Sequence, residues 1–184
     1  MRPLLKGEGL RLVRGGRLLF EGLDLELGPG DALHVTGPNG SGKTSLIRLV
    51  AGLLRPNAGR LERAEAALTD GALALDRELP LSRALAFWNG PRLGRAMAAF
   101  HLDELADVPV RLLSAGQAKR ASLARVMASG SPLWLLDEPL NGLDRDGARQ
   151  LDAAASVHRE AGGAVLAASH LPLDGEWRVL ELGA

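Results

Sequence analysis

The stretch Gly37–Thr44, GPNGSGKT, decides the fold, because it matches the phosphate-binding pattern G-x-x-x-x-G-K-[ST] in full. A strand pattern, DALHVTG, precedes it, and a helical pattern, KTSLIRLVAGLL, follows it. The helix is expected to carry its apolar side chains on one face, namely Leu46, Ile47, Val50, Leu53 and Leu54. An ordinary glycine turn before a helix is the competing interpretation. The order of strand, glycine loop and helix favours a nucleotide-binding α/β unit instead.

The chemistry of this loop indicates how it would hold a nucleotide. Glycines let successive backbone N–H groups and the positive end of the helix face an anion. Lys43 is expected to reach the β- and γ-phosphates, and the Thr44 hydroxyl to ligate Mg²⁺. The predicted nucleotide-binding residues are Gly37, Pro38, Asn39, Gly40, Ser41, Gly42, Lys43, Thr44 and Ser45.

A second pattern, PLWLLDEP, is typical of a strand buried on both faces of a parallel sheet, with acidic residues where it ends. Asp137 is predicted to hold the Mg²⁺ shell. Glu138 is predicted to orient and deprotonate the attacking water beside the γ-phosphate. A turn capped by an aspartate before Pro139 is the alternative, and the phosphate loop elsewhere in the chain argues against it.

The pattern AVLAAS predicts another buried strand and places His170 at the same edge of the sheet. An imidazole donor at that position can bind the γ-phosphate and signal its presence. The other histidines are expected to be structural, because His34 lies within an apolar strand and His101 and His158 lie in helical patterns.

The stretch LSAGQ, Leu113–Gln117, predicts a helix start with a capping box between Ser114 and Gln117. Gly116 leaves its backbone exposed there, so the same helix start can also bind an anion. The phosphates held by the first loop are already surrounded by that loop. We therefore expect this second site to serve a nucleotide bound to another copy of the chain.

Composition excludes several other classes of protein. The 184 residues carry 22 basic and 22 acidic side chains, so neither bulk electrostatic binding to nucleic acid nor a polybasic membrane tether is expected. Cysteine is absent, which excludes disulfides and thiolate metal sites. No run of apolar residues is long enough to span a membrane, so direct membrane insertion is not expected. If the protein works at a membrane, a partner must bring it there.

In this order, GPNGSGKTS, LLSAGQ, LWLLDEP, NGLD and SH resemble the motifs of the nucleotide-binding subunits of ATP-binding-cassette (ABC) transporters, over essentially the whole chain. The resemblance implies an α/β P-loop NTPase of ABC type, with a mixed or parallel central sheet, N-terminal antiparallel strands and an inserted helical subdomain. We expect one domain, residues 1–184, with a RecA-like core at about 1–72 and 130–184 and the helical subdomain at about 73–129.

The resemblance also implies a head-to-tail homodimer that forms with ATP and holds two ATP molecules at its interface. Ser114, Gly116 and Gln117 would contact the nucleotide of the opposite subunit, and Asp144 of NGLD would lie at the dimer seam. Lys43, Glu138 and His170 are the implied catalytic residues, and ATP and Mg²⁺ the implied ligands.

The sequences around and between the motifs, such as LLSAGQAKRASLAR and FEGLDLELGPGDALHVTG, are similar to those of the ATP-binding subunits of the bacterial haem exporter of cytochrome c maturation, the CcmA family. That resemblance implies an ATPase that powers the release of haem-loaded chaperone. It also implies a peripheral protein on the cytoplasmic face of the inner membrane, with integral-membrane partners like CcmB and CcmC. The alternatives are an ATPase of another small exporter and a soluble ABC ATPase without a transport role.

The sequence departs from the family pattern at two positions. ABC subunits usually carry an aromatic residue that stacks on adenine, and here only Val13 or Arg14 is available, of which the guanidinium of arginine can stack on a base. The glutamine expected between the lobes is also missing, and Asp70 or Gly71 occupies its place.

Phe87 and Trp88 are two of only six aromatic residues of the Phe and Trp types. They are predicted either to pack inside the helical subdomain or to form a groove for a short helix of a membrane partner.

Overall fold

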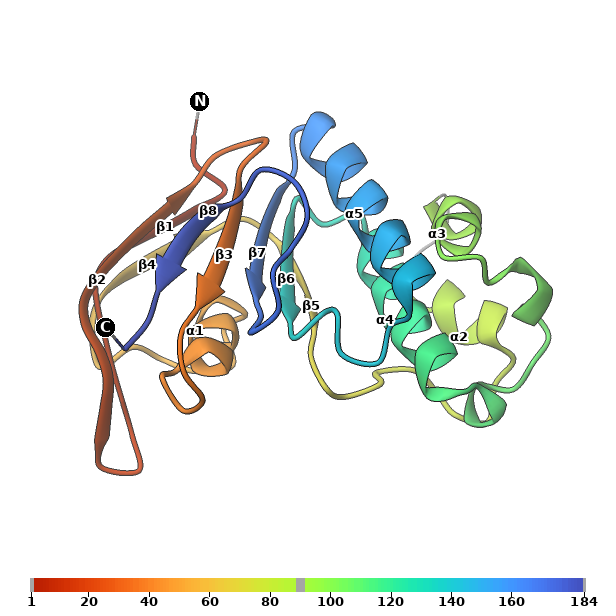
Figure 1. Ribbon diagram of the computed structural model, residues 1–184, viewed down its shortest axis with the longest axis horizontal. Helices are drawn as coiled ribbons and strands as arrows, with labels where there is room; N and C mark the ends of the chain where they lie inside the picture. The colour runs from red at the N-terminus through yellow and green to blue at the C-terminus, as the bar shows by residue number, and fades with distance from the viewer. Residues whose placement is uncertain (1, 89–91, 184) are drawn as a thin grey trace.

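The computed structural model describes residues 2–88 and 92–183, in which two β-sheets and a group of helices lie in layers (Figure 1). The central sheet has five strands in the order β5-β6-β7-β3-β8, and every neighbouring pair is parallel. These strands are β3 (Ala32–Thr36), β5 (Ala66–Thr69), β6 (Leu133–Asp137), β7 (Ala164–Ala168) and β8 (Arg178–Glu181). Their carboxyl ends therefore meet at one edge, where ligands of open α/β sheets bind.

A second, antiparallel sheet has the order β2-β1-β4 and contains β1 (Leu5–Arg14), β2 (Arg17–Leu27) and β4 (Ala58–Arg63). The N-terminal antiparallel strands that the family resemblance implies are thus present as β1 and β2. Neither β4 nor β5 was predicted. Strand β4 is almost wholly exposed and rich in arginine, so it lacks the apolar alternation that marks a strand, and β5 has only four residues.

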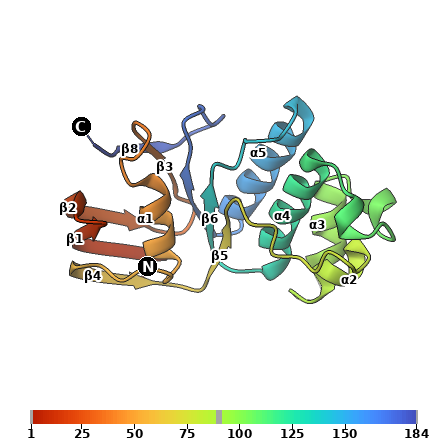
Figure 2. The ribbon, with the colours of Figure 1, turned by 90° about the horizontal axis from the view of Figure 1, so that it is seen from below.

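Helix α1 (Lys43–Val50) begins at the phosphate loop and lies between the two sheets (Figure 2). Leu46, Ile47 and Val50 pack with apolar residues of both sheets, as predicted. The predicted continuation to Leu53 and Leu54 is wrong. The helix ends before Gly52, whose φ of +82° is left-handed, and Leu53 is 62% exposed.

Strand β6 confirms that a near-continuous apolar run can mean burial on both faces. Leu133 and Leu135 point into the cluster around α1, whereas Trp134 and Leu136 belong to the cluster on the helical side. Each fully buried side chain of this size contributes about 1.5–3 kcal/mol to folding. The alternation fixes the strand in register and with it the position of the acidic residues at its end.

The helical side of the sheet carries α2 (Leu81–Ala86), α3 (Leu93–Ala99), α4 (Ala115–Ser129) and α5 (Arg145–Glu160), with 3₁₀ turns at Asp103–Leu105 and Val110–Leu112. Within 73–88 and 92–129 there is no strand, only an isolated bridge between Pro80 and Pro109, as the pattern predicted. His101 is an exception to the helical prediction, because it lies in a turn after α3 with φ +49°. The proposed division into core and helical subdomain stays a prediction.

Candidate nucleotide site

The phosphate loop connects β3 to α1 and depends on glycine where the chain approaches itself. Gly37 has φ +133°, and a Cβ there would lie 2.2 Å from the carbonyl oxygen of Leu182. The buried Lys43 donates from Nζ to the carbonyl oxygens of Gly37 (2.7 Å) and Pro38 (3.1 Å). Ser41 Oγ is buried and has no hydrogen-bond partner among the described residues. A phosphate oxygen would satisfy both the ammonium and this hydroxyl.

Asp137 at the end of β6 lies against the start of α1. The Thr44 hydroxyl donates to Asp137 Oδ1 over 3.0 Å. Burial raises the pKa of Asp137, while the bond from Thr44 lowers it and the neighbouring Glu138 raises it. A hydroxyl and a carboxylate that converge in this way are oxygen ligands of the kind Mg²⁺ prefers.

Glu138 is held in an unusual backbone conformation. Its φ is +46°, a left-handed value that costs a residue other than glycine about 1–2 kcal/mol. Its N–H donates to the carbonyl of Ala168 at the end of β7 (2.8 Å). Its Oε2 lies 2.9 Å from Nδ1 of His170, so the two predicted catalytic side chains contact each other directly.

Lys119 is a neighbour of Glu138 that the sequence did not reveal. From α4, its Nζ donates to the carbonyl oxygen of Glu138 over 2.9 Å. Burial lowers the pKa of Lys119, although the carboxylates of Asp137 and Glu138 act against that effect. Lys119 lies five residues past Ser114, and only the fold brings it to the end of β6.

The residues predicted to contact the nucleotide of another copy, Ser114, Gly116 and Gln117, are the signature residues, and they lie at the start of α4. Both bonds of the predicted capping box are present: Ser114 N–H donates to Gln117 Oε1 (2.8 Å), and Gln117 N–H donates to Ser114 Oγ (3.3 Å). A Cβ on Gly116 would come within 3.3 Å of the carbonyl oxygen of Gly142. Asp144 is exposed and caps α5 through the N–H of Gly147 (2.7 Å). The side chains of Ser114, Gln117 and Asp144 are thus hydrogen-bonded within their own helix starts. Ser114 and Asp144 are exposed, whereas Gly116 and Gln117 are half-buried.

The residues that stand in place of the adenine-stacking aromatic and of the glutamine between the lobes also lie near the site. Arg14 at the end of β1 is exposed and donates weakly to Ser45 Oγ on α1 (3.4 Å). Asp70 directly follows β5, lies 3.9 Å from an Arg48 nitrogen, and accepts from the N–H of Ala72. Asp70 and Gly71 line a cavity of about 450 Å³ that Lys119, Asp137 and Glu138 also line.

Known proteins with similar sequences decide the family. The family model described as "ABC transporter" matches residues 20–141. A "Cytochrome c biogenesis ATP-binding export protein CcmA" from Sphingopyxis alaskensis is 56% identical over 94% of this chain and 93% of its own length. The protein of the same name from Novosphingobium aromaticivorans is 58% identical over 87% and 85%. The chain belongs to the CcmA family of ABC transporter ATPases. The resemblance seen in its motifs is confirmed.

Solved structures give the same fold at lower identity. An ATP-binding subunit of an ABC transporter superposes on 98% of this CcmA-family chain with a TM-score of 0.85 at 21% identity. An ATP-binding cassette described as dimeric and bound to ADP and Pi in a post-hydrolysis state covers 97% with a TM-score of 0.81 at 20% identity. The predicted ABC-type α/β fold is confirmed.

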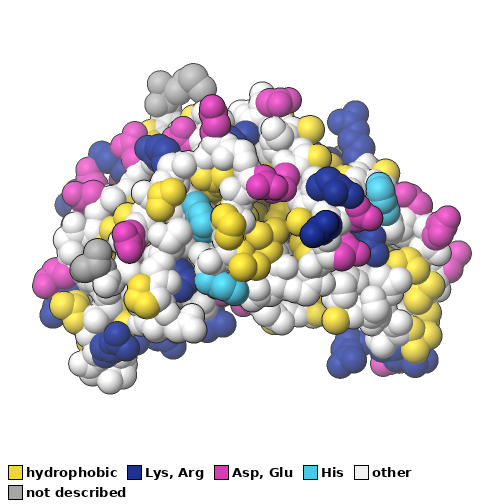
Figure 3. Space-filling view, in the orientation of Figure 1, with side chains coloured by type: hydrophobic (Ala, Val, Ile, Leu, Met, Phe, Trp, Pro, Cys, Tyr) yellow, Lys and Arg dark blue, Asp and Glu magenta, His cyan; other side chains and the backbone are white. Residues whose placement is uncertain are grey.

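The surface around His170 in this CcmA-family chain is open. The His170 side chain is 52% exposed and that of Glu138 29%. Hydrophobic side chains gather near the middle of one face with histidines beside them (Figure 3), and a hollow there is lined by His34, His170, Leu171 and Trp177. A nucleotide can therefore reach the pair from solvent.

Three of the four histidines have structural contacts. His34 is buried, and its Nε2 contacts the carbonyl of Ser169 at 3.1 Å. His158 stacks on Trp134 with ring centroids 4.1 Å apart, and burial lowers its pKa. His101 contacts Gln150 at 2.9 Å.

The two aromatics of the helical side differ from each other. Trp88 is half-buried, packs against the core, and lies under the guanidinium of Arg125, 4.8 Å from its ring centroid. Phe87 is 81% exposed. Trp88 thus packs against the core, whereas Phe87 meets the Trp88 ring edge-on, with ring centroids 5.5 Å apart, and leaves most of its own surface exposed.

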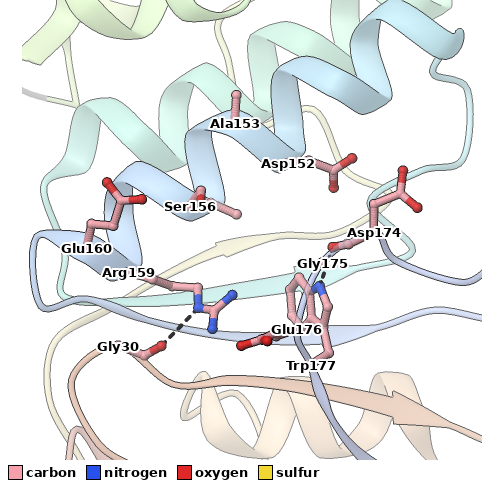
Figure 4. A pocket seen from close by; sticks show the side chains of 11 residues that line it. Gly30, Asp152, Ala153, Ser156, Arg159, Glu160, Asp174, Gly175, Glu176 and Trp177 are labelled. Atoms are coloured by element: carbon pink, nitrogen blue, oxygen red, sulfur yellow. Dashed lines mark hydrogen bonds between the residues drawn. The ribbon is translucent and has the colours of Figure 1, made fainter.

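A separate groove of about 660 Å³ lies between α5 and the segment before β8 and contains none of the predicted site residues (Figure 4). Asp152 on α5 and Asp174 both line it, and Trp177 Nε1 donates to the carbonyl of Asp174. Burial and the negative charge of Asp174 raise the pKa of Asp152 to about 6.

Proposed function

We propose that this chain hydrolyses ATP to ADP and phosphate as the energy-coupling subunit of a transporter that exports haem for c-type cytochrome biogenesis. The CcmA relatives support the biological process. The observation that carries the catalytic assignment is the contact of 2.9 Å between Glu138 and His170 at the edge where Lys43 and Thr44 also lie.

The chemistry follows from the donors and acceptors at this edge. The carboxylate of Glu138 accepts a proton from the attacking water, and the water oxygen forms the new bond to the γ-phosphorus as the bond to ADP breaks. His170 orients the carboxylate through Nδ1. Lys43 exchanges its two loop carbonyls for phosphate oxygens and absorbs negative charge there, together with the backbone N–H groups of Gly37–Thr44.

The residues present fit a magnesium ion, because the hydroxyl of Thr44 and the carboxylate of Asp137 converge beside the loop. We assign these two residues to hold it. When bound with ATP, Mg²⁺ neutralises charge on the β- and γ-phosphates.

We further propose that two copies of the chain enclose two ATP molecules in C₂ symmetry. Ser114, Gly116 and Gln117 would contact the nucleotide of the opposite copy, with Asp144 at the seam. Support comes from the exposure of Ser114 and Asp144 and from the dimeric state of a solved cassette of the same fold. Arg14 would stack on adenine from its place beside α1.

No helix among residues 2–88 and 92–183 is long and apolar enough to cross a membrane. We propose a peripheral position on the cytoplasmic face of the bacterial inner membrane, held by integral-membrane partners like CcmB and CcmC. Phe87 supports this proposal, since a phenylalanine with 81% of its surface exposed is a ready contact for an apolar partner helix.

Co-purification tests this function directly. The tagged chain is recovered from membranes of its own organism, partners are identified by mass spectrometry, and the eluate is scanned for haem absorbance. Integral-membrane haem-handling partners are expected. Recovery of an unrelated permease would discard haem export and favour another small exporter, and recovery without any membrane protein would favour a soluble ABC ATPase.

A matched pair of variants tests the docking residue. Phe87→Ser should reduce recovery of the membrane partners, whereas Val179→Ser should not, although Val179 is also 65% exposed. Equal recovery of the membrane partners with both variants would show that Phe87 does not belong to the interface.

A further inference from the structure

We propose that Lys119 is a positioning residue, which holds Glu138 in its catalytic conformation and links that glutamate to the signature start of α4 in the same chain. The inference rests on the proposed role of Glu138 in hydrolysis. It concerns a residue outside the phosphate loop, the signature and the strand ends.

The backbone of Glu138 needs support, because its φ of +46° is unfavourable for any residue with a side chain. Its N–H is fixed by Ala168 and its carboxylate by His170. Its carbonyl oxygen accepts from Lys119 Nζ at 2.9 Å and, over a longer distance of 3.3 Å, from the N–H of Asn141. The bond from the ammonium is charge-assisted and is therefore the stronger of the two.

Lys119 is one of three polar contacts on a single face of α4. Lys119, Ser122 and Arg125 are spaced three residues apart, so they follow one side of the helix. Ser122 Oγ lies 2.6 Å from Thr69 Oγ1, and Arg125 donates to the carbonyl of Leu68, both on β5. The contacts of Ser122 and Arg125 thus fix the helix to β5. Of these three side chains, Lys119 is the one that reaches the residue after β6.

The position of Lys119 on α4 gives the contact a further consequence. Ser114 and Gln117 cap the first turn of this helix, and Lys119 follows within the next turn. Any shift of the helix start on binding a partner's nucleotide therefore moves the donor that holds Glu138. We infer that when the start of α4 closes over the ATP of the partner chain, Lys119 positions Glu138 of its own chain for the hydrolysis of the other ATP.

Steady-state kinetics of the complex with its membrane partners tests this inference. Lys119→Met removes the donor and should lower kcat for ATP roughly 10- to 100-fold, as small misplacements of a catalytic group do, with KM unchanged within about threefold. Lys119→Arg keeps a donor and should recover most of kcat. Ser122→Ala removes the neighbouring contact on the same helix face and should keep kcat within about twofold.

A double variant separates positioning from a merely structural role. If Lys119 acts through the carboxylate of Glu138, then Lys119→Met should not lower the residual rate of Glu138→Gln any further. Lys119→Leu replaces Lys119→Met if the latter fails to fold, as judged by its thermal unfolding midpoint.

Different results would contradict the role of Lys119 and the role of Glu138. Wild-type kcat in Lys119→Met, an equal loss in Lys119→Arg, or a further loss in the double variant would each overturn the inference about Lys119. Undiminished hydrolysis by Glu138→Gln alone would overturn the proposed role of the glutamate instead, so the two failures are distinguishable.

Discussion

The two halves of the proposed ATP site are built in different ways. The loop half comprises Lys43, Thr44, Asp137, Glu138 and His170. The signature half comprises Ser114, Gly116, Gln117 and Asp144. In the loop half, two side-chain contacts join distant parts of the chain, since Thr44 contacts Asp137 and His170 contacts Glu138. In the signature half, the side chains of Ser114, Gln117 and Asp144 accept from backbone N–H groups only three residues away.

This difference indicates what each half can do alone. Long-range contacts hold the loop half in place before any ligand arrives, which lowers the cost of binding and of reaching the transition state. The signature half consists of two helix starts that are capped by their own side chains, with Ser114 and Asp144 exposed to solvent. We therefore expect a single chain to bind ATP and a pair of chains to hydrolyse it.

The largest effect is expected from Glu138→Gln. The amide cannot accept the proton of the attacking water, so kcat should fall about 10²- to 10⁴-fold, the usual contribution of a general base. Binding of a fluorescent ATP analogue should stay within about threefold of wild type. A loss of binding as large as the loss of kcat would mean that Glu138 serves nucleotide affinity instead.

A smaller but still large effect is expected from Gly116→Asp in the signature half. The added side chain meets the carbonyl of Gly142 and places a negative charge where phosphate is expected, so hydrolysis should fall roughly 100-fold. Binding of ATP by the single chain should persist, because the loop half is intact. If binding measured by fluorescence titration disappears as well, the division into two halves is wrong.

Asp152 lies outside both halves and should affect stability alone. Its pKa is raised from 3.8 to about 6 in the folded chain, so the folded state loses stability as pH rises from about 4 to 6. The shift corresponds to roughly 3 kcal/mol, which solvent screening of a partly exposed group reduces to about 1 kcal/mol. Asp152→Asn should therefore stabilise the protein by about 1 kcal/mol at pH 7.5 and by almost nothing at pH 4.

Urea unfolding at the two pH values measures this difference, with the ATPase rate as the control. An equal increase in the free energy of unfolding at both pH values would show that the charge of the Asp152 carboxylate does not cause the stabilisation.

The smallest effect is expected from Arg14→Ala. Stacking of a guanidinium on a base in an exposed site is worth about 0.5–1 kcal/mol, so affinity for ATP should fall roughly two- to fivefold. The preference for ATP over ribose triphosphate, which has no base, should shrink by the same factor. An unchanged preference in competition binding would leave Val13 or the backbone as the adenine contact.

Much of the loop half could be predicted from sequence, since each part is a short local pattern. The buried strands β6 and β7 of the parallel sheet bring their final residues to one edge, where Glu138 contacts His170 and Asp137 contacts Thr44 of the phosphate loop. The capping box at Ser114 is equally local and is confirmed.

The parts that escaped prediction depend on contacts between distant residues. Lys119 meets Glu138 only because α4 packs beside the end of β6. The early end of α1 depends on the left-handed Gly52, and exposed β4 is formed by its pairing with β1 more than by its own pattern. Phe87 and Trp88 are adjacent in sequence, but only the tertiary packing distinguishes the exposed ring from the packed one.

Completion of the ATP site by a second chain is the central claim, and light scattering of Glu138→Gln at saturating ATP tests it most directly. The variant should bind ATP without consuming it, so its mass should rise from that of one chain, 19.4 kDa, to that of two. Adding Gly116→Asp to the same chain should return it to the mass of one chain with ATP still bound. A Glu138→Gln chain that binds ATP and stays monomeric would contradict the claim.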